Sequence, residues 1–439
     1  MGTKDTSFLE KRFKLSENKT TVRTEFLAGF TSFVTVAYIL VVNPIILSDA
    51  GMDKDALFTT TILASIIGTL AMSLFANYPF VLAPGMGLNA FFAYSVVLNM
   101  GYSWQFALTA VFIEGLIFIV LTFLNVREAI IEAIPINIKH AVSVGIGLFI
   151  AFLGLRSAGI IVADPEGTLI KLGDVTEYGP LVTIIGLIIT GVLVAKDIKG
   201  GLLIGIIAST IVGIPFDITP MPSKVIDLPP SIKPIAFQFV GFDQIFSWDM
   251  LIVLFTFLFV DLFDTIGTLL GVASKADMLD DDGNLPGAKP ALFADAVGTT
   301  FGAVLGTSTV TTTVESAAGV AEGGRTGLTS LVTTVFFALA LLFSPILTII
   351  PAQATAPALI IVGLFMMSPI TKIDLNDFTE AIPAFLTIIM MPLAFSIAEG
   401  LVFGMVSYVL LKVFTGRGRE ASPILYILSI LFVLKYIGL

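Results

Sequence analysis

The feature of this sequence that most constrains its fold is the recurrence of long apolar runs from one end of the chain to the other. A bilayer-spanning helix needs about 20 predominantly apolar residues, and many of the runs reach this length with only short polar stretches between them. Charged residues make up 13% of the 439 residues, about half the share that covers a soluble domain. We therefore predict an all-α polytopic membrane protein, embedded in a lipid bilayer.

The composition excludes several classes of function. The chain has no cysteine, so neither disulfides nor thiolate metal sites are available, and no metal or organic cofactor is expected. The net charge of −10 argues against a nucleic-acid partner. Six Lys and Arg residues stand within the first 23 positions, which makes this segment too charged for a signal peptide. Residues 1–26 are instead predicted to be a cytoplasmic leader.

Fourteen spans are predicted from the apolar runs. With the N-terminus in the cytoplasm, the loops assigned to the outside hold few basic residues and the cytoplasmic segments hold most of them, as the positive-inside rule requires. The segment 421–438 is left over, either as an interfacial helix or as a further span. The predicted spans are 27–47, 56–76, 80–98, 104–124, 138–155, 179–195, 200–214, 249–271, 291–306, 309–323, 328–350, 353–369, 378–396 and 398–414.

A motif in the first half of the chain returns in the second. The motif consists of I-P, eleven further residues and G-L-F. It stands at 134–149 in the first half and at 350–365 in the second. A repeat unit of seven spans has an odd number of crossings, so its two copies must enter the membrane in opposite directions. Inverted repeats of this kind are typical of secondary transporters.

One stretch in each half interrupts the helical pattern, and the first is 78–90. Pro84 disfavours helix at Ala83, so the residues up to Ala83 are expected to be extended. Pro84 also suits the first turn of a helix that runs on through Asn89. The first stretch is thus predicted to be a short strand followed by a half-helix.

The second stretch, 306–316, gives the same prediction. Its run of Thr and Val favours strand, and helix is expected to resume at Thr312, where Thr312 and Glu315 match a capping box. Lipid satisfies no backbone N–H or C=O group, so the two short strands are expected to pair with each other. The N-termini of the two half-helices would then converge on one site.

Two aspartates lie in the middle of the span 249–271, which contains no basic residue. Asp261 and Asp264 are three residues apart and so lie on one helix face. A charge at mid-bilayer costs ~2.5–3.5 kcal/mol on insertion scales. These carboxyl groups must therefore face polar protein, water or a ligand, or be protonated, and a carboxyl that gains and loses a proton is the minimum requirement for proton coupling.

Structural roles remain open for the other polar residues of the spans. Glu315 fits a helix cap as well as a binding site, and a buried Asn89 can simply tie helices together. Glu114 and Glu399 are expected near helix ends, solvated or structural.

The residues around the two half-helices suggest a class of ligand. Helix N-termini attract anions, but the added carboxyl groups make an anionic substrate unfavourable. Carboxylates accept hydrogen bonds and an amide both donates and accepts, which favours a ligand rich in N–H groups or a cation. Phe91, Phe92 and Tyr94 stand close by in sequence and could stack on a ring or serve only in packing. A flat heterocycle with donors and acceptors fits this set.

Four segments resemble a known family. They are F-T-S-F-V-T-V-A-Y-I-L-V-V-N-P (30–44), A-P-G-M-G-L-N-A-F-F-A-Y (83–94), V-D-L-F-D-T-I-G-T-L-L-G (260–271) and T-V-E-S-A-A-G-V-A-E-G-G-R-T-G-L (313–328). These segments are similar to the AzgA-like purine permeases, a branch of the nucleobase–ascorbate transporter (nucleobase:cation symporter) superfamily. The likeness extends over essentially the whole chain.

The resemblance implies a fold of two inverted seven-span repeats with short antiparallel strands in spans 3 and 10. It divides the chain into a core domain (27–125 and 249–350), a gate domain (126–222 and 351–439, with the C-terminal helix) and an extracellular linker (223–248). It implies proton-coupled import of hypoxanthine, guanine or adenine by elevator motion of core against gate. The expected state is a homodimer in the inner or plasma membrane.

The resemblance also implies the site residues. Asp261, Asp264 and Glu315 would bind substrate and carry the proton, although sodium stays open as the coupling ion. The superfamily usually has Glu where Asp261 stands, and the shorter side chain leaves more room for a bicyclic purine. The other expected substrate-binding residues are Asn89, Ala83, Gly87 and Thr313.

Two other function classes are compatible with a polytopic membrane protein. An anion exchanger of the sulfate or bicarbonate type would share the fold, but the buried acids argue against it. A membrane-embedded enzyme is disfavoured because the spans contain no His/Cys cluster and no Ser–His pair.

Overall fold

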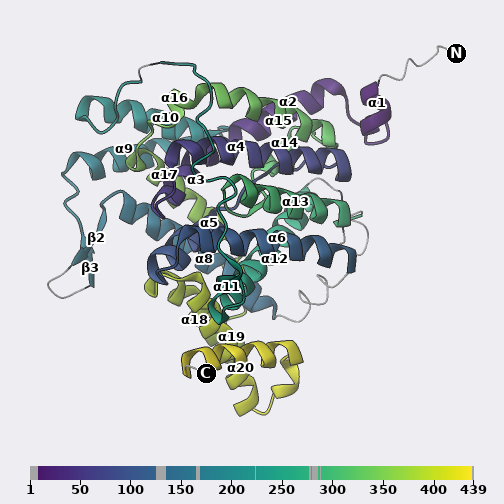
Figure 1. Cartoon of the computed structure of the whole chain (residues 1–439), viewed down its shortest axis with the longest axis vertical. Coiled ribbons are helices and arrows are strands. Elements are labelled where there is room, and N and C mark those ends of the chain that lie inside the picture. Colours follow the sequence, from purple (N-terminus) through teal and green to yellow (C-terminus); the bar gives the residue numbers. More distant parts are fainter. Residues whose placement is uncertain are drawn as a thin grey trace.

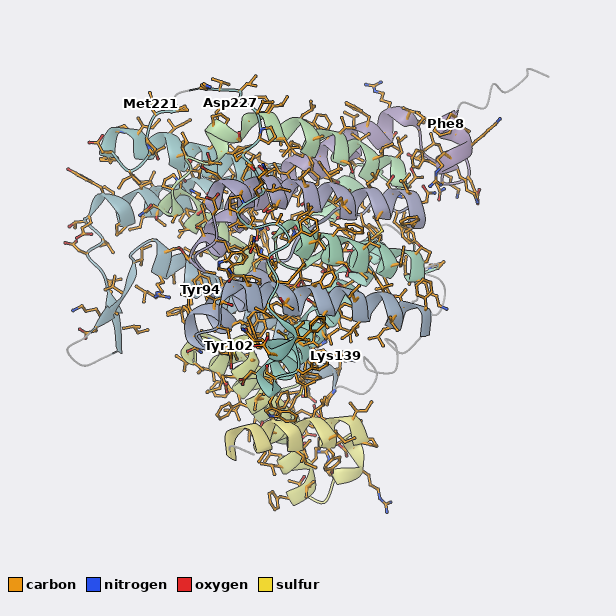
Figure 2. The ribbon with its side chains drawn as sticks, viewed as in Figure 1. Phe8, Tyr94, Tyr102, Lys139, Met221 and Asp227 are labelled. Carbon is orange, nitrogen blue, oxygen red and sulfur yellow. The ribbon has the colours of Figure 1, made fainter. Side chains whose placement is uncertain are left out.

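The computed structural model describes residues 8–124, 135–164, 169–222, 224–275, 278, 285–286 and 288–437, and most of these are helical (Figure 1). The first seven positions of the predicted leader and residues 126–134 of the predicted gate lie outside the described residues. Figure 2 shows how densely side chains fill the space between the helices.

The elements fall in chain order into two series. The first comprises α1 (Phe8–Phe13), α2 (Val22–Val36), α3 (Ile39–Ser48), α4 (Lys54–Ala71), η1 (Met72–Ala76), β1 (Leu82–Pro84), α5 (Met86–Ala90), the π-helical η2 (Phe91–Asn99), α6 (Trp104–Leu124), α8 (Ile136–Ser157), β2 (Ile161–Asp164), β3 (Leu169–Leu172), α9 (Tyr178–Ala195), α10 (Gly201–Gly213) and η3 (Ile214–Phe216). The second comprises α11 (Phe242–Ile245), α12 (Trp248–Lys275), α13 (Ala288–Leu305), β4 (Val310–Thr312), α14 (Ser316–Ala321), α15 (Gly327–Ala340), η4 (Leu341–Phe343), α16 (Ser344–Leu347), α17 (Ala352–Met366), η5 (Ser368–Lys372), α18 (Phe378–Leu393), α19 (Ile397–Phe414), η6 (Gly418–Glu420) and α20 (Pro423–Ile437).

Each predicted span coincides with one of these helices, with two or three helices in succession, or with a strand and the one or two helices after it. Eight helical segments among the described residues, some of them made of two or three consecutive helices, are long and apolar enough to cross a bilayer. The total of fourteen spans stays a prediction.

The two short strands pair with each other, as predicted. β1 and β4 are antiparallel, with Leu82 opposite Thr312 and Pro84 opposite Val310. Beyond the ladder, Thr313 donates its backbone N–H to the Val81 carbonyl at 2.9 Å. All the strand residues are buried, so the pairing satisfies backbone groups that lipid would leave unpaired.

The predicted capping box after β4 is wrong. Thr312 is the last residue of the strand and α14 begins only at Ser316. Glu315 makes no side-chain cap bond; its carboxylate accepts a hydrogen bond from another span instead. The helix therefore begins four residues later than the local sequence indicates, because the partner strand offers the backbone groups at Thr312 and Thr313 a better alternative to helix.

The packing of the second series repeats that of the first. Contacts of α2 with α15 correspond to those of α12 with α6, and contacts of α8 with α18 to those of α17 with α9. The repeat-related glycines of α8 and α17 meet each other: a methyl group on Gly147 or on Gly363 would contact the carbonyl oxygen of the other. This arrangement agrees with the predicted inverted repeat.

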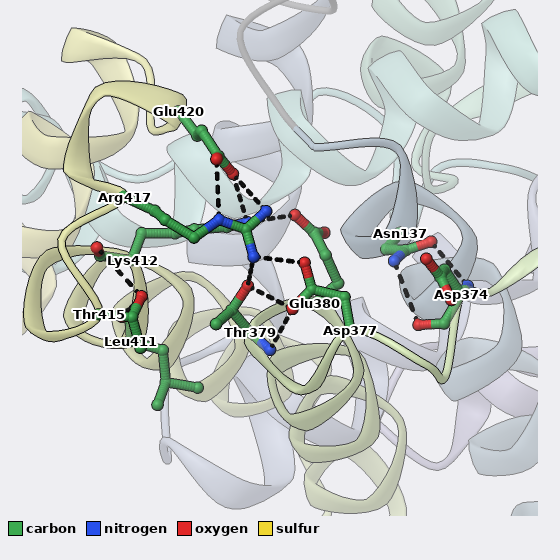
Figure 3. Close-up of polar contacts among 10 residues, drawn as sticks. All are labelled: Asn137, Asp374, Asp377, Thr379, Glu380, Leu411, Lys412, Thr415, Arg417 and Glu420. Atoms are coloured by element: carbon green, nitrogen blue, oxygen red, sulfur yellow. Dashed lines mark hydrogen bonds and ion pairs between the residues drawn. The ribbon is translucent and has the colours of Figure 1, made fainter.

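An ion cluster joins α18, α19 and η6 (Figure 3). Lys412 is fully buried, and its Nζ lies 2.9 Å from Glu380 Oε1 and 2.7 Å from Glu420 Oε2. Arg417 binds both carboxylate oxygens of Glu420 and donates to Asp377 Oδ2 at 2.6 Å. These bonds fix the end of α19 against the start of α18.

The leftover segment 421–438 forms α20, which packs on α19. It buries Leu425 and Phe432 against the rest of the protein. Its 15 residues are fewer than the about 20 that a span needs, which favours the interfacial reading of the two left open.

Candidate functional site

The candidate site lies where α12 passes the paired strands and the two half-helices, since α12 contacts β4, α5 and α14. Asp261 and Asp264 lie on this part of α12. Asp261 is fully buried and accepts a hydrogen bond from Thr265 Oγ1, one turn further along, at 3.0 Å. The helix thus supplies both a carboxyl group and the hydroxyl that binds it.

A third aspartate from the next helix joins this group, and the sequence interpretation missed it. Asp295 of α13 is fully buried, and both its oxygens lie 3.2 Å from Thr265 Oγ1. Its Oδ1 also accepts the backbone N–H of Thr312 at 3.2 Å. Asp261 and Asp295 therefore share one hydroxyl group, which has a single proton to donate.

Asp264 approaches the strands from the same helix and is partly buried. A methyl group on Gly85 would lie 3.5 Å from Asp264 Oδ2 and 2.8 Å from the Thr311 methyl group. Gly85 thus leaves room for α12 to pass close to the turn between β1 and α5. Asp295 and Glu315 are close enough to act on Asp264 electrostatically.

Glu315 is held by a residue of the first span that the sequence interpretation also missed. Tyr38 donates its hydroxyl to Glu315 Oε1 at 2.7 Å and is itself buried. Tyr38 lies at the break between α2 and α3, where Val41 bonds back to Tyr38 at 3.1 Å and Pro44 offers no backbone donor. The break turns the tyrosine toward the half-helix of the second repeat. A polar aromatic residue six positions before a proline in an apolar span was the available signal.

Asn89 lies in α5 and is fully buried. Its Oδ1 accepts a hydrogen bond from Ser308 Oγ. Its Nδ2 has no hydrogen-bond partner among the residues that the structure describes. The amide thus keeps a donor that a ligand can use.

The aromatic residues after Asn89 mostly pack within the protein. Phe91 and Phe92 are fully buried and meet Phe257 edge to face, with ring centroids 4.8 and 6.5 Å apart. Tyr94 donates to Asp49 Oδ2 at 2.7 Å. Of the two readings of these rings, the contacts favour packing.

The three remaining predicted residues lie in β1, in α5 and directly after β4. Ala83 is buried in β1 opposite Thr311. Gly87 allows α5 to approach α8, because a methyl group there would lie 2.7 Å from Ile146 Cγ2. Thr313 is bound to the Val81 carbonyl through both its N–H and its hydroxyl.

The placement predicted for Glu114 is wrong. Glu114 lies in the middle of α6, not near its end, and is fully buried. Its Oε2 accepts a hydrogen bond from Thr309 Oγ1 at 2.9 Å. Glu399 does lie in the first turn of α19. Among the described residues, no group of three or more His, Cys, Asp or Glu side chains is placed to hold a metal ion.

Paired strands between broken helices, with carboxyl groups beside them, define a class of membrane transporter. Solved structures share this fold. One is the transmembrane domain of the cyanobacterial bicarbonate transporter BicA, with a TM-score of 0.66, 15% identity and coverage of 87% of this chain and 97% of that one. Another is the murine anion transporter Solute Carrier 26 family member A9, with a TM-score of 0.64, 12% identity and coverage of 94% and 73%.

Within that class, the chain belongs to the Permease family, whose family model matches residues 23–403. A putative permease of Methanocaldococcus jannaschii is 49% identical, over 98% of this chain and 99% of that protein. The guanine/hypoxanthine permease PbuG of Bacillus subtilis is 47% identical over 97% and 99%. The adenine permease AdeP of Escherichia coli is 43% identical over 98% and 96%.

These matches confirm the resemblance to the nucleobase–ascorbate transporters. The protein is a multi-pass membrane protein. Its relatives are permeases and not enzymes.

Proposed function

We propose that this permease imports purine nucleobases, namely hypoxanthine, guanine or adenine, together with protons. The observation that carries the proposal is the set of carboxyl groups that three different spans bring to the paired strands, where α12 also contacts α5, the half-helix that carries Asn89. Carboxylates accept hydrogen bonds and the amide can donate, which suits a planar base whose edge carries both N–H groups and acceptor atoms. The names of the relatives at 43% and 47% identity point to the same class of ligand.

In this proposal Asp261, Asp264 and Glu315 accept hydrogen bonds from the base, and Asn89 donates one. The proposed site is bounded on one side by the backbone of Ala83, Gly87 and Thr313. In support of this, Asp264 and Glu315 are only partly buried.

The coupled proton is proposed to bind within the same carboxyl group cluster. Asp261 and Asp295 lie against one hydroxyl group, at 3.0 and 3.2 Å. Two adjacent negative charges repel each other strongly where water is scarce, and a proton on either carboxyl group removes that repulsion. Release of the proton on the cytoplasmic side would then weaken substrate binding and complete the cycle.

Transport is proposed to follow an elevator mechanism, with residues 27–125 and 249–350 as the moving core and residues 126–222 and 351–439 as the gate. Supporting this, α8, α9, α10, α17, α18 and α19 pack mainly on one another, and α2, α4, α6, α12, α13 and α15 do the same. Where α5 of the core meets α8 of the gate, Gly87 allows the two helices to approach closely, with Ile146 opposite it. The proposed assembly is a homodimer in the cell membrane with its N-terminus in the cytoplasm.

The second candidate, anion exchange, is favoured only by the fold that the chain shares with the bicarbonate and anion transporters. At 12–15% identity this likeness concerns the fold alone. The acidic residues beside the half-helices oppose an anionic substrate electrostatically.

Equilibrium binding of hypoxanthine, guanine, adenine, xanthine and uracil to the purified protein, repeated at several pH values, tests the proposal. One or two purines should bind tightly, and more tightly as the pH falls. Glu315→Gln and Asp261→Asn should abolish concentrative uptake in proteoliposomes, whereas Glu17→Gln, which alters an exposed glutamate, should not.

Three results would contradict parts of the proposal. Absence of purine binding at every pH would overturn the function. Uptake that follows a sodium gradient and ignores a proton gradient would overturn proton coupling alone. Full uptake by both Glu315→Gln and Asp261→Asn would overturn the site.

A further inference from the structure

The segment before β4 begins at a fixed turn and consists of three hydroxyl residues. Gly306 has φ +102°, and a methyl group on it would lie 2.6 Å from the Ile235 carbonyl oxygen, so only glycine fits this turn. Thr307, Ser308 and Thr309 follow it, and all three are fully buried. None of them lies in a helix, so none can bond the carbonyl group one turn back as helical Ser and Thr do.

Each of the three hydroxyl groups bonds a different span of the first repeat. Thr307 accepts from Asn43 Nδ2 of α3 at 3.0 Å. Thr309 donates to Glu114 Oε2 of α6 at 2.9 Å. Ser308, between them, donates to Asn89 Oδ1 of α5. The two outer bonds therefore fix the position from which Ser308 reaches Asn89.

The bond from Ser308 determines which end of the Asn89 amide stays available. With Oδ1 occupied by Ser308, Nδ2 is left without a partner in the described part of the chain, although Asn89 is fully buried. A buried donor is costly to leave unpaired, so an acceptor atom on a bound ligand is the partner that this arrangement calls for.

We propose that Ser308 is a positioning residue for the substrate: it holds the Asn89 amide with its N–H₂ group toward the ligand, and Thr307 and Thr309 hold Ser308 in place. This inference rests on the proposed function and deepens it. The site then selects a base that presents an acceptor atom, a ring nitrogen or a carbonyl oxygen, to Asn89.

The test compares Ser308→Ala with Ser308→Thr in equilibrium binding of hypoxanthine, guanine and adenine to the full-length protein. Without the Ser308 hydroxyl group the amide can turn, and affinity for the base that binds wild type is expected to fall about tenfold. Threonine keeps the hydroxyl group and should restore affinity to near the wild-type value. Ser65→Ala is the matched control, because Ser65 is equally buried and, among the residues that the structure describes, its hydroxyl group bonds only Thr61 O of its own helix.

A double-mutant cycle separates positioning from a general effect on folding. In an Asn89→Ala background, Ser308→Ala should cause no further loss of affinity, because there is no amide left to orient. If Ser308→Ala does not fold, Ser308→Cys, which keeps the size and a weak donor, should show an intermediate loss.

The outcomes are distinct. If wild type binds a base and Ser308→Ala binds it equally well, or if the loss persists in the Asn89→Ala background, the inference is wrong while the proposed function stands. If wild type binds no nucleobase, the proposed function fails and the inference fails with it.

Discussion

Replacing Gly147 with alanine is expected to destabilise the protein, although alanine is the better helix former. The added methyl group would lie 2.5 Å from the Gly363 carbonyl oxygen and 2.9 Å from Met366 Cβ. Non-bonded atoms prefer about 3.5 Å, so α8 and α17 must move apart by about 1 Å at this point. Overpacking costs ~1–3 kcal/mol, and Gly→Ala in a helix contributes ~1 kcal/mol in the opposite direction. With the middle of the first range, the expected net loss is about 1 kcal/mol.

The assay is the midpoint of thermal unfolding of the purified protein in detergent, with Gly191→Ala as the matched control. Gly191 lies in α9, and nothing lies within 4 Å of a methyl group added there. That variant should unfold at the same temperature as wild type or a higher one. The double variant Gly147→Ala/Gly363→Ala should lose less than the two single losses together, because one separation of the helices relieves both contacts. A Gly147→Ala protein as stable as Gly191→Ala would refute the reasoning.

Three further predictions concern polar contacts. Tyr38→Phe removes the donor to Glu315 at 2.7 Å and should weaken nucleobase binding about tenfold or more, since a hydrogen bond to a charged group contributes ~1.5–3 kcal/mol. Lys412→Met removes a fully buried ammonium group whose partners Glu380 and Glu420 are partly exposed. It should cost about 2 kcal/mol of stability, measured by thermal unfolding, because two hydrogen bonds between charged groups are lost. The hydrogen bond from Arg417 is the chief cause that lowers the pKa of Asp377 to about 2. The stability that this carboxylate contributes is therefore present above pH 3.8 and lost as the pH falls toward about 2. Arg417→Gln should shift this loss to higher pH in unfolding measured across the acid range.

Each of these has a control. Tyr102→Phe, between η2 and α6, should leave nucleobase affinity unchanged, and an equal loss there would count against a specific role of Tyr38. Lys224→Met breaks an exposed ion pair with Asp227 at 2.9 Å and should cost less than about 1 kcal/mol; a shift as large as that of Lys412→Met would contradict the argument from burial. An acid-unfolding profile of Arg417→Gln that overlays that of wild type would show that Arg417 does not stabilise the carboxylate.

The spans and the strand pair were predictable because the bilayer allows few alternatives. Backbone groups in lipid must be satisfied internally, so an apolar run of sufficient length is a helix. The interruption at Pro84 and the Thr and Val run of the second repeat had only each other as partners. The same reasoning did not fix where helix resumes after β4, because Thr312 has both a capping pattern and a strand partner, and only the three-dimensional arrangement decides between them.

The polar contacts of the site were less predictable, for a physical reason. Many hydroxyl groups in the spans bond a carbonyl group of their own helix, as Thr122 does to Phe118 at 2.7 Å. Such residues carry no information about neighbouring helices. Ser308 and Thr309 differ because they lie outside helices, so in a membrane protein they must bond another segment. The sequence interpretation missed Asp295, although Asp295 carries the same signal as Asp261, an acidic residue in an apolar span. From sequence alone, a single acidic residue toward the end of a span is easily interpreted as exposed to water.

The segments that lead into β1 and β4 are each hydrogen-bonded to the opposite repeat. These bonds limit the ways in which the proposed core can move. The segment before β4 is bound by spans of the first repeat, through Asn43 and Glu114. The segment before β1 is bound by α15 of the second repeat: Ser330 Oγ donates to Tyr78 O at 2.6 Å and to Phe80 O at 3.0 Å. Neither repeat can then shift relative to the other without breaking buried hydrogen bonds, each costly to lose. Alternating access by separation of the two repeats is therefore disfavoured, and motion of both repeats' core helices as one body against the gate is the alternative that leaves the substrate site unchanged.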